Sequence, residues 1–210
     1  MREVIVKHYQ FEELDDKAKE TAREWFREGE SEMFGAHGEI NEPLETAAKL
    51  LGIEFDGVPV KLMGGGMRTE PDIRWSGFGC QGDGASFVGC YGHAKGAAKR
   101  IRAEFPTDTV LHGIADELAG IQKRNGYRVS ARVRQMTVEV FKGDKEAYAD
   151  GSSEQDSALA AEVLDAMRRF AQWIYDYLQQ EYEYRMSDES VDESIRANEY
   201  EFLENGRRAV

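Results

Sequence analysis

Apolar positions along the chain change repeatedly between a period of two and a period near 3.6, which predicts a protein of mixed strands and helices. Runs with a period of two predict strands over residues 3–9, 53–62, 71–79, 84–91, 127–134 and 136–141, and a closing strand over 199–203. Helical spacing predicts helices over residues 11–28, 41–51, 94–104 and 108–124, and a short one over 187–197.

The longest predicted helix covers residues 154–184. Ser153 and Asp156 have the spacing of a capping box, and a stripe of apolar side chains follows at intervals of three and four residues. Because such a stripe needs a large apolar partner, we expect the helix to lie across one face of the sheet. The sequence therefore predicts an α+β fold with an antiparallel sheet. We expect one domain over residues 1–210, with the softest boundary at 142–153.

A glycine-rich block, WSGFGCQGDGASF, stands between two aromatic-rich runs of the central sequence. Its Gln81-Gly82-Asp83-Gly84 segment predicts a tight hairpin turn, because glycine accepts the positive φ that such turns need. We expect Trp75, Phe78 and Phe87 to be largely buried, and Gly84→Val to be destabilising if the φ of Gly84 is positive. Residues 77–82 also spell GxGxxG, but a strand-like run follows instead of the helix that a dinucleotide site requires.

Two interpretations of this block remain open. As a small enzyme, the protein would use Asp83 in the exposed turn, with Gln81 orienting a water and His93 nearby. The alternative is that Asp83 only makes the turn, through hydrogen bonds from its carboxylate to the backbone. Cys80, Cys90, His93 and His112 lack the close cysteine pair that is typical of zinc sites, so neither a metal nor a cofactor is expected.

Charge changes this picture more than composition does. The 210 residues include 40 acidic and 27 basic side chains, a net charge of −13. Residues 12–32 carry −5 and residues 176–204 carry −8, whereas Lys123 to Arg134 form a basic stretch. Acidic end segments suit a basic partner protein, or a second copy of the chain in a homodimer, and they disfavour direct binding of nucleic acid. The alternative is that these charges only keep the surface hydrated.

The sequence gives no indication of a membrane segment. The longest uncharged run is far shorter than the stretch of about 18 apolar residues that spans a bilayer, and the first residues lack the apolar centre of a signal peptide. Two cysteines make no disulfide framework. We therefore expect a cytoplasmic protein.

Three segments together resemble a family of tailed-phage and prophage proteins: YQFEELDDKAKETAREWFRE, IRWSGFGCQGDGASF and EYEYRMSDESVDESIRANEYEF. Proteins with this WSGF-x-x-QGDGA-x-F block are often labelled "antitoxin of toxin–antitoxin stability system". The resemblance implies a phage-borne protein in the cytosol of a bacterial host, a setting in which inhibitors of host defence are common. It implies no catalytic residues.

The resulting functional hypothesis is an acidic binding protein that inhibits a host defence system, of the anti-CRISPR or anti-restriction type. Its carboxylates would imitate phosphates and occupy the basic surface of a nucleic-acid-binding effector. An antitoxin would use the same physics against a toxin, and the small enzyme at residues 77–84 is the other alternative. The expected binding surface consists of acidic side chains near the C-terminus: Asp176, Glu181, Glu183, Asp188, Glu189, Asp192, Glu193, Glu199, Glu201 and Glu204.

Overall fold

The computed structural model describes residues 7–35, 40–62, 64–135, 137–143, 145–147 and 154–209, without the side chains of 145–147 and 154–157. The chain forms two compact units. The sheet unit comprises Gly38–Leu178, and the terminal unit comprises Met1–His37 together with Gln179–Val210. The boundary predicted at 142–153 lies largely outside the described residues, and the single domain stays a prediction.

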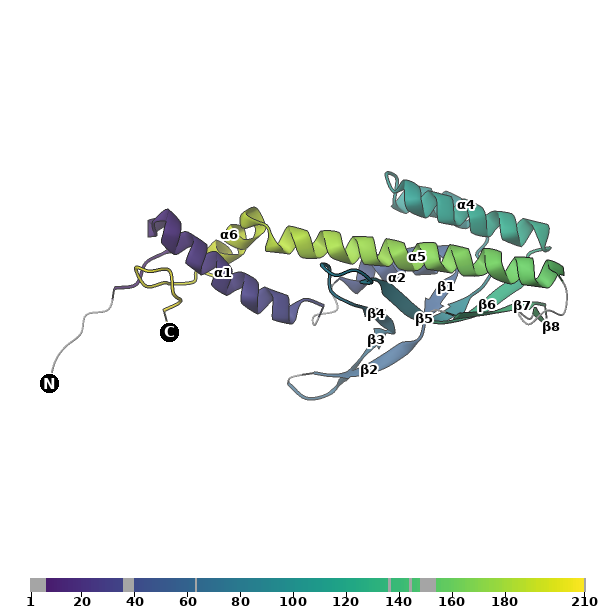
Figure 1. Cartoon of the computed structure of the whole chain (residues 1–210), viewed down its shortest axis with the longest axis horizontal. Helices are drawn as coiled ribbons and strands as arrows, with labels where there is room; N and C mark the ends of the chain where they lie inside the picture. The colour runs from purple at the N-terminus through teal and green to yellow at the C-terminus, as the bar shows by residue number, and fades with distance from the viewer. Residues whose placement is uncertain are drawn as a thin grey trace. The chain divides into compact units, whose positions relative to one another are not determined.

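The predicted α+β class and the antiparallel sheet are confirmed (Figure 1). In the described part of the chain, one sheet has the order β1-β5-β6-β7-β8, and β4 also pairs with β5. These strands are β1 (Ile53–Phe55), β4 (Ile73–Trp75), β5 (Ala85–Tyr91), β6 (Val129–Arg134), β7 (Thr137–Lys142) and β8 (Lys145–Ala147). All of these pairs are antiparallel. Short connections join β4 to β5 and β6 to β7, and such connections allow only antiparallel pairing.

Two of the predicted strands differ from the observed ones. The single strand expected over 53–62 ends at Asp56, whose N–H donates to the carbonyl of Val88 and whose carbonyl accepts from Asp72. The chain then leaves the sheet as β2 (Gly57–Lys61), which pairs with β3 (Met67–Pro71) in a separate hairpin. The strand expected over 71–79 is reduced to β4, because a glycine-rich loop begins after Trp75.

One face of the sheet unit forms its core. Phe87, Gly89 and Tyr91 alternate along β5 as buried residues, which is the period of two that the sequence predicts. Gly89 is required by its neighbours, because a Cβ there would lie 2.2 Å from the carbonyl oxygen of Glu54 on β1. On the other face Cys90 and Arg132 stand side by side, both at least partly exposed.

Helix α5 (Glu154–Met186) covers this core, as predicted. Its stripe of Val163, Met167, Phe170 and Ile174 is buried, with exposed fractions of 2% or less. The Phe170 ring lies 5.7 Å from that of Phe87 on β5. Each such buried side chain contributes about 1.5–3 kcal/mol to folding. None of the described helices is both long and apolar enough to span a membrane.

Three more helices complete the sheet unit: α2 (Asn41–Leu51), α3 (Ala97–Glu104) and α4 (Thr109–Arg124). All three match predicted helices within a few residues. Asp108 caps α4 by accepting from the N–H of Leu111 at 2.8 Å. Gln122 is buried at 1% exposure, and its amide donates to the carbonyl of Val129 at 2.7 Å and to the Tyr91 hydroxyl at 3.0 Å. This glutamine fixes α4 to β5 and β6.

The terminal unit has its own small core. It contains a 3-10 turn η1 (Phe11–Glu13), the helices α1 (Asp16–Met33) and α6 (Asp188–Ala197), and the last turns of α5. One cluster of buried side chains forms this core: Phe11, Leu14, Ala18, Ala22, Val191, Ile195 and Phe202. Of the strand predicted over 3–9, residues 3–6 lie outside the described residues and Tyr9 forms one isolated bridge to Phe202. The closing strand expected over 199–203 is likewise reduced to bridges at Phe202.

Candidate functional site

The glycine-rich loop between β4 and β5 is held together by Asp83. One carboxylate oxygen, Oδ2, accepts from the N–H of Gly79 at 2.9 Å and from that of Cys80 at 2.6 Å. These bonds, with that from Cys80 as the largest cause, lower the pKa of Asp83, so the carboxylate remains ionised. Asp83 therefore makes the turn, which is one of the two roles that the sequence leaves open for it. Gly82, at φ +99°, supplies the positive φ, whereas Gly84 does not have one.

Aromatic side chains fasten this loop to α5. Trp75 stacks on Phe78 with ring centroids 5.1 Å apart, and Phe78 lies 5.5 Å from Tyr175. The Tyr175 hydroxyl also donates to the carbonyl of Gly77 at 3.3 Å. The expected burial is confirmed for Phe87, at 1% exposure, and wrong for Trp75, at 37%, whereas Phe78 is only partly buried. Trp75 lies at the end of a three-residue strand, where few elements cover it.

The enzymatic candidates are not brought together. Gln81 shares the loop with Asp83 and is exposed. His93 follows the other end of β5, where its ring lies 4.9 Å from that of Tyr127. Since β5 has seven residues, and a strand rises about 3.4 Å per residue, His93 and Asp83 are separated by roughly 20 Å.

The residues weighed for a zinc site are also dispersed. Cys80 lies in the loop and Cys90 on β5, both free and exposed. The Cys90 sulfur accepts from Arg132, and His112 on α4 contacts the carbonyl of Phe105 at 2.8 Å. Among the residues described, no three His, Cys, Asp or Glu side chains gather in a way that would hold a metal ion.

The predicted acidic surface divides into paired and unpaired side chains. Asp192 is the most engaged: Arg23 binds both of its oxygens, at 2.6 and 2.8 Å, and the Asp192 side chain is only 14% exposed. The bonds from Arg23 are the largest cause that lowers the pKa of Asp192. Arg27 pairs with one oxygen of Asp188. Both carboxylates hold α6 against α1, but only Asp192 is shielded from a partner, because the Asp188 side chain is 65% exposed.

The other predicted acids lie at the surface or make weaker contacts. Glu201 bonds the ring of His8 at 2.8 Å, and Glu181 lies 3.9 Å from Arg185. Asp176 and Glu183 each accept from a glutamine four residues earlier. The rest are exposed and, within the described residues, form no ion pair: Glu189, Glu193, Glu199 and Glu204.

A row of carboxylates on α1 was not among the predicted site residues. Asp16, Glu20, Glu24, Glu28 and Glu32 recur every four residues and are all exposed. Glu20 contacts Arg23 and Arg27, and the other four make no ion pair with any described residue. We call these five side chains the α1 carboxylate row. The spacing is visible in the sequence, and a scan of helical positions for like charges would have found it.

The basic stretch of residues 123–134 is largely neutralised by carboxylates. Arg124 pairs with Glu162 at 2.6 Å, and Arg132 pairs with Asp56. Arg134 lies 3.5 Å from Glu139. The described structure shows no ion pair for the two remaining bases, Lys123 and Arg128. This stretch is therefore a weak candidate for binding an anionic partner.

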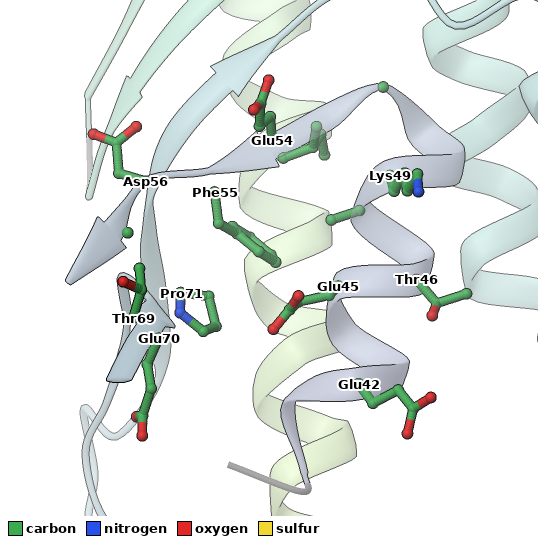
Figure 2. Close-up of a pocket in the computed structure, with 14 residues that line it drawn as sticks. Glu42, Glu45, Thr46, Lys49, Glu54, Phe55, Asp56, Thr69, Glu70 and Pro71 are labelled. Carbon is green, nitrogen blue, oxygen red and sulfur yellow. The ribbon is translucent and has the colours of Figure 1, made fainter. Parts of the chain in front are cut away.

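An acidic groove lies between α2 and the strands β1 and β3 (Figure 2). Its volume is about 860 Å³, and Phe55 and Pro71 give it an apolar floor. Glu45 extends from α2 toward these two residues. The other charged side chains of its lining are Glu42, Glu54, Asp56, Glu70 and Lys49. Two of these carboxylates are already paired, Asp56 with Arg132 and Glu70 with Arg68.

One family model matches the chain. It is described as a domain of unknown function, DUF8835, and it matches residues 37–188, more than two thirds of the sequence. The matched region contains the whole sheet unit and ends within the terminal unit. Neither the curated proteins nor the solved structures contain a match.

Proposed function

The chain belongs to the DUF8835 family, whose description assigns no activity, and we propose that it is an acidic binding protein that occupies the basic surface of another protein. The proposed partner is a nucleic-acid-binding effector of a bacterial defence system, of the CRISPR or restriction type. Carboxylates compete with phosphates for such a surface, because both are anionic hydrogen-bond acceptors. The protein would inhibit the effector by excluding its nucleic acid.

The uneven distribution of charge carries this proposal. The terminal unit holds 19 acidic against 10 basic side chains, a net charge of −9, whereas the larger sheet unit carries −4. A net charge this concentrated creates a negative potential that attracts basic surfaces over several ångströms. A charge needed only for solubility has no reason to collect on a third of the chain.

The α1 carboxylate row gives this charge a regular geometry. Four helical residues rise about 6 Å and turn about 40° beyond one full turn, so the carboxylates of Asp16 to Glu32 wind along α1 as a shallow spiral in which successive members are neighbours. Like charges four residues apart destabilise a helix by about 0.2–0.5 kcal/mol per pair. The row therefore costs stability, and an anion-binding groove on a partner would compensate that cost.

Some charged side chains of the terminal unit form ion pairs within it, and we call these paired residues its frame. Arg23 and Arg27 join α1 to α6, and Arg185 reaches Glu30 at 3.2 Å. Arg196 on α6 reaches Glu12 at 2.5 Å. These four arginines thus hold the terminal unit together. The outward carboxylates of α1, together with Glu189 and Glu193, remain for a partner.

The resemblance to phage and prophage proteins supports a target in host defence. The antitoxin alternative uses the same acidic surface and differs only in its partner. The small-enzyme alternative has less support, because His93 lies at the far end of β5 from Asp83 and Gln81.

A matched pair of charge-reversal variants tests the proposal. Glu24→Lys with Glu28→Lys changes the row, and Glu104→Lys with Asp165→Lys makes the same change in charge on exposed residues of the sheet unit. Each protein is immobilised and exposed to lysate of a bacterial host, and bound proteins are eluted with duplex DNA or with salt, then identified. We expect wild type and the sheet-unit variant to retain a nucleic-acid-binding protein that DNA releases, and the α1 variant to lose it.

Circular dichroism and thermal melting of both variants control for unfolding. Retention that survives reversal of the row, or that DNA and salt leave unchanged, contradicts the proposal. A retained partner that is a toxin without nucleic-acid affinity supports the antitoxin alternative instead.

A further inference from the structure

A second cavity lies within the sheet unit, beside the glycine-rich loop. Its volume is about 400 Å³, and its wall comes from the loop, from the adjoining residues of β5, β6 and β7, and from α5. Sites for small organic ligands usually measure about 300–1,000 Å³, so the cavity is large enough for one small molecule. None of its lining residues belongs to the α1 carboxylate row or to the acidic groove.

The deep part of this cavity is apolar. Val138 on β7 and Leu164 on α5 line it and are partly exposed, so they offer apolar surface to a ligand. Val133 and Met167 also line it but are almost fully buried, at 1% and 2% exposure, and add little accessible surface. The cavity therefore suits a ligand with an apolar body.

Two opposite charges stand in the same lining. Arg168 on α5 is exposed and makes no ion pair with the residues that the structure describes. Asp83 lines the loop side, and the amides of Gly79 and Cys80 keep its carboxylate ionised by lowering its pKa. A guanidinium prefers carboxylate or phosphate groups, whereas a carboxylate prefers an ammonium group.

Two backbone features mark the cavity as more than a packing defect. Gly84 lines it without a positive φ, and a Cβ at this position would meet no heavy atom within 4 Å. Neither the conformation nor the neighbours require glycine there. Because glycine has no side chain, a ligand can approach the backbone closely at this position. Gln135 also lines the cavity and has φ 55°, in a turn where asparagine or glycine is less strained. Strained residues of this kind collect at ligand sites.

We propose that this cavity binds a small zwitterion with an apolar body, the chemical class to which the free aromatic amino acids belong. The carboxylate of the ligand pairs with Arg168, its ammonium group faces Asp83, and its ring lies against Val138 and Leu164. This site uses other residues than the proposed binding surface does, so either one can fail without the other.

Isothermal titration of the full chain with three related compounds tests the site. L-phenylalanine carries both charges, 3-phenylpropanoate lacks the ammonium group, and 2-phenylethylamine lacks the carboxylate. We expect phenylalanine to bind, and each of the other two to bind about tenfold more weakly or worse, because one ion pair is lost. Wild-type protein that takes up no phenylalanine at millimolar concentration, or that binds all three compounds equally, overturns the proposal.

Variants locate the binding within the cavity. Arg168→Gln should abolish the preference for phenylalanine over phenylethylamine, and Asp83→Asn the preference over phenylpropanoate. Gly84→Val should block binding while the melting temperature stays near that of wild type. Gly79→Val is the matched control, since Gly79 also lacks a positive φ and close neighbours but does not line the cavity. Binding that survives in Gly84→Val, or that is lost equally in folded Gly79→Val, places the ligand elsewhere and refutes the site.

Discussion

At the scale of single residues, long-range partners decide what an acidic side chain can do. Asp192 and Glu193 are neighbours in the sequence. Asp192 nevertheless forms an ion pair with Arg23, 169 residues away, whereas Glu193 is exposed. The sequence placed both in one binding surface, because nothing in the local pattern reveals a partner so far away. Charge and helix position were predictable, whereas the division into frame and surface was not.

This division predicts a pH-dependent difference between two variants. Asp192→Asn should lower the free energy of unfolding at pH 7 by about 1–3 kcal/mol, because a charge-assisted pair is lost. The folded pKa of Asp192 is depressed, so its contribution is present above the unfolded pKa of about 3.9 and is lost as the pH falls below it. Urea unfolding should therefore show a difference from wild type that shrinks from pH 7 to pH 3.

Glu193→Gln is the control for this comparison. Its side chain is exposed and makes no ion pair with the described residues, so it should change the stability by less than about 0.5 kcal/mol at either pH. An effect as large as that of Asp192→Asn, or a loss in Asp192→Asn that does not change with pH, would refute the assignment of Asp192 to the frame.

At the scale of elements, helices and strands with a strong hydrophobic periodicity could be predicted from the sequence, and those with a weak periodicity could not. The helices α4 and α5 and the strands β5 and β6 were predicted, because each buries one clear apolar face. The hairpin of β2 and β3 was missed, since β3 consists mainly of polar or exposed residues and β2 continues the apolar run of β1. The loop around Asp83 was predicted as a turn, but its cavity depends on α5, which lies about 80 residues further along the chain.

Two glycines of the same loop differ in backbone conformation, since Gly82 has a positive φ and Gly84 does not. Gly82→Ala should lower the free energy of unfolding by about 1–3 kcal/mol, because at φ +99° a side chain is strained. Gly84→Ala should change it by less than about 0.5 kcal/mol, because Gly84 has no positive φ and no crowded neighbour. Denaturant unfolding of both variants measures the contrast. Equal losses at the two positions would mean that the loop adopts another conformation.

At the scale of the whole molecule, the terminal unit carries most of the acidic net charge, and the sheet unit contains the β-sheet and both cavities. The region that matches the DUF8835 family contains the sheet, the glycine-rich loop and both cavities, whereas α1 with its carboxylate row precedes it. The α+β class of the sheet unit followed from periodicity alone. The concentration of charge in the terminal unit could be counted in the sequence, but only the structure shows which arginines are engaged in ion pairs.

The rate of association with the partner tests the central claim most directly. The association rate with the recovered partner is measured at increasing ionic strength for three proteins: wild type, Glu24→Lys/Glu28→Lys and Glu104→Lys/Asp165→Lys. If the row steers the encounter, wild type and the sheet-unit variant should associate about tenfold or more faster at low salt than at high salt. The α1 variant should associate slowly with a weaker dependence on salt. Equal rates and equal salt dependence in all three proteins would contradict an acidic surface on α1 as the site of action.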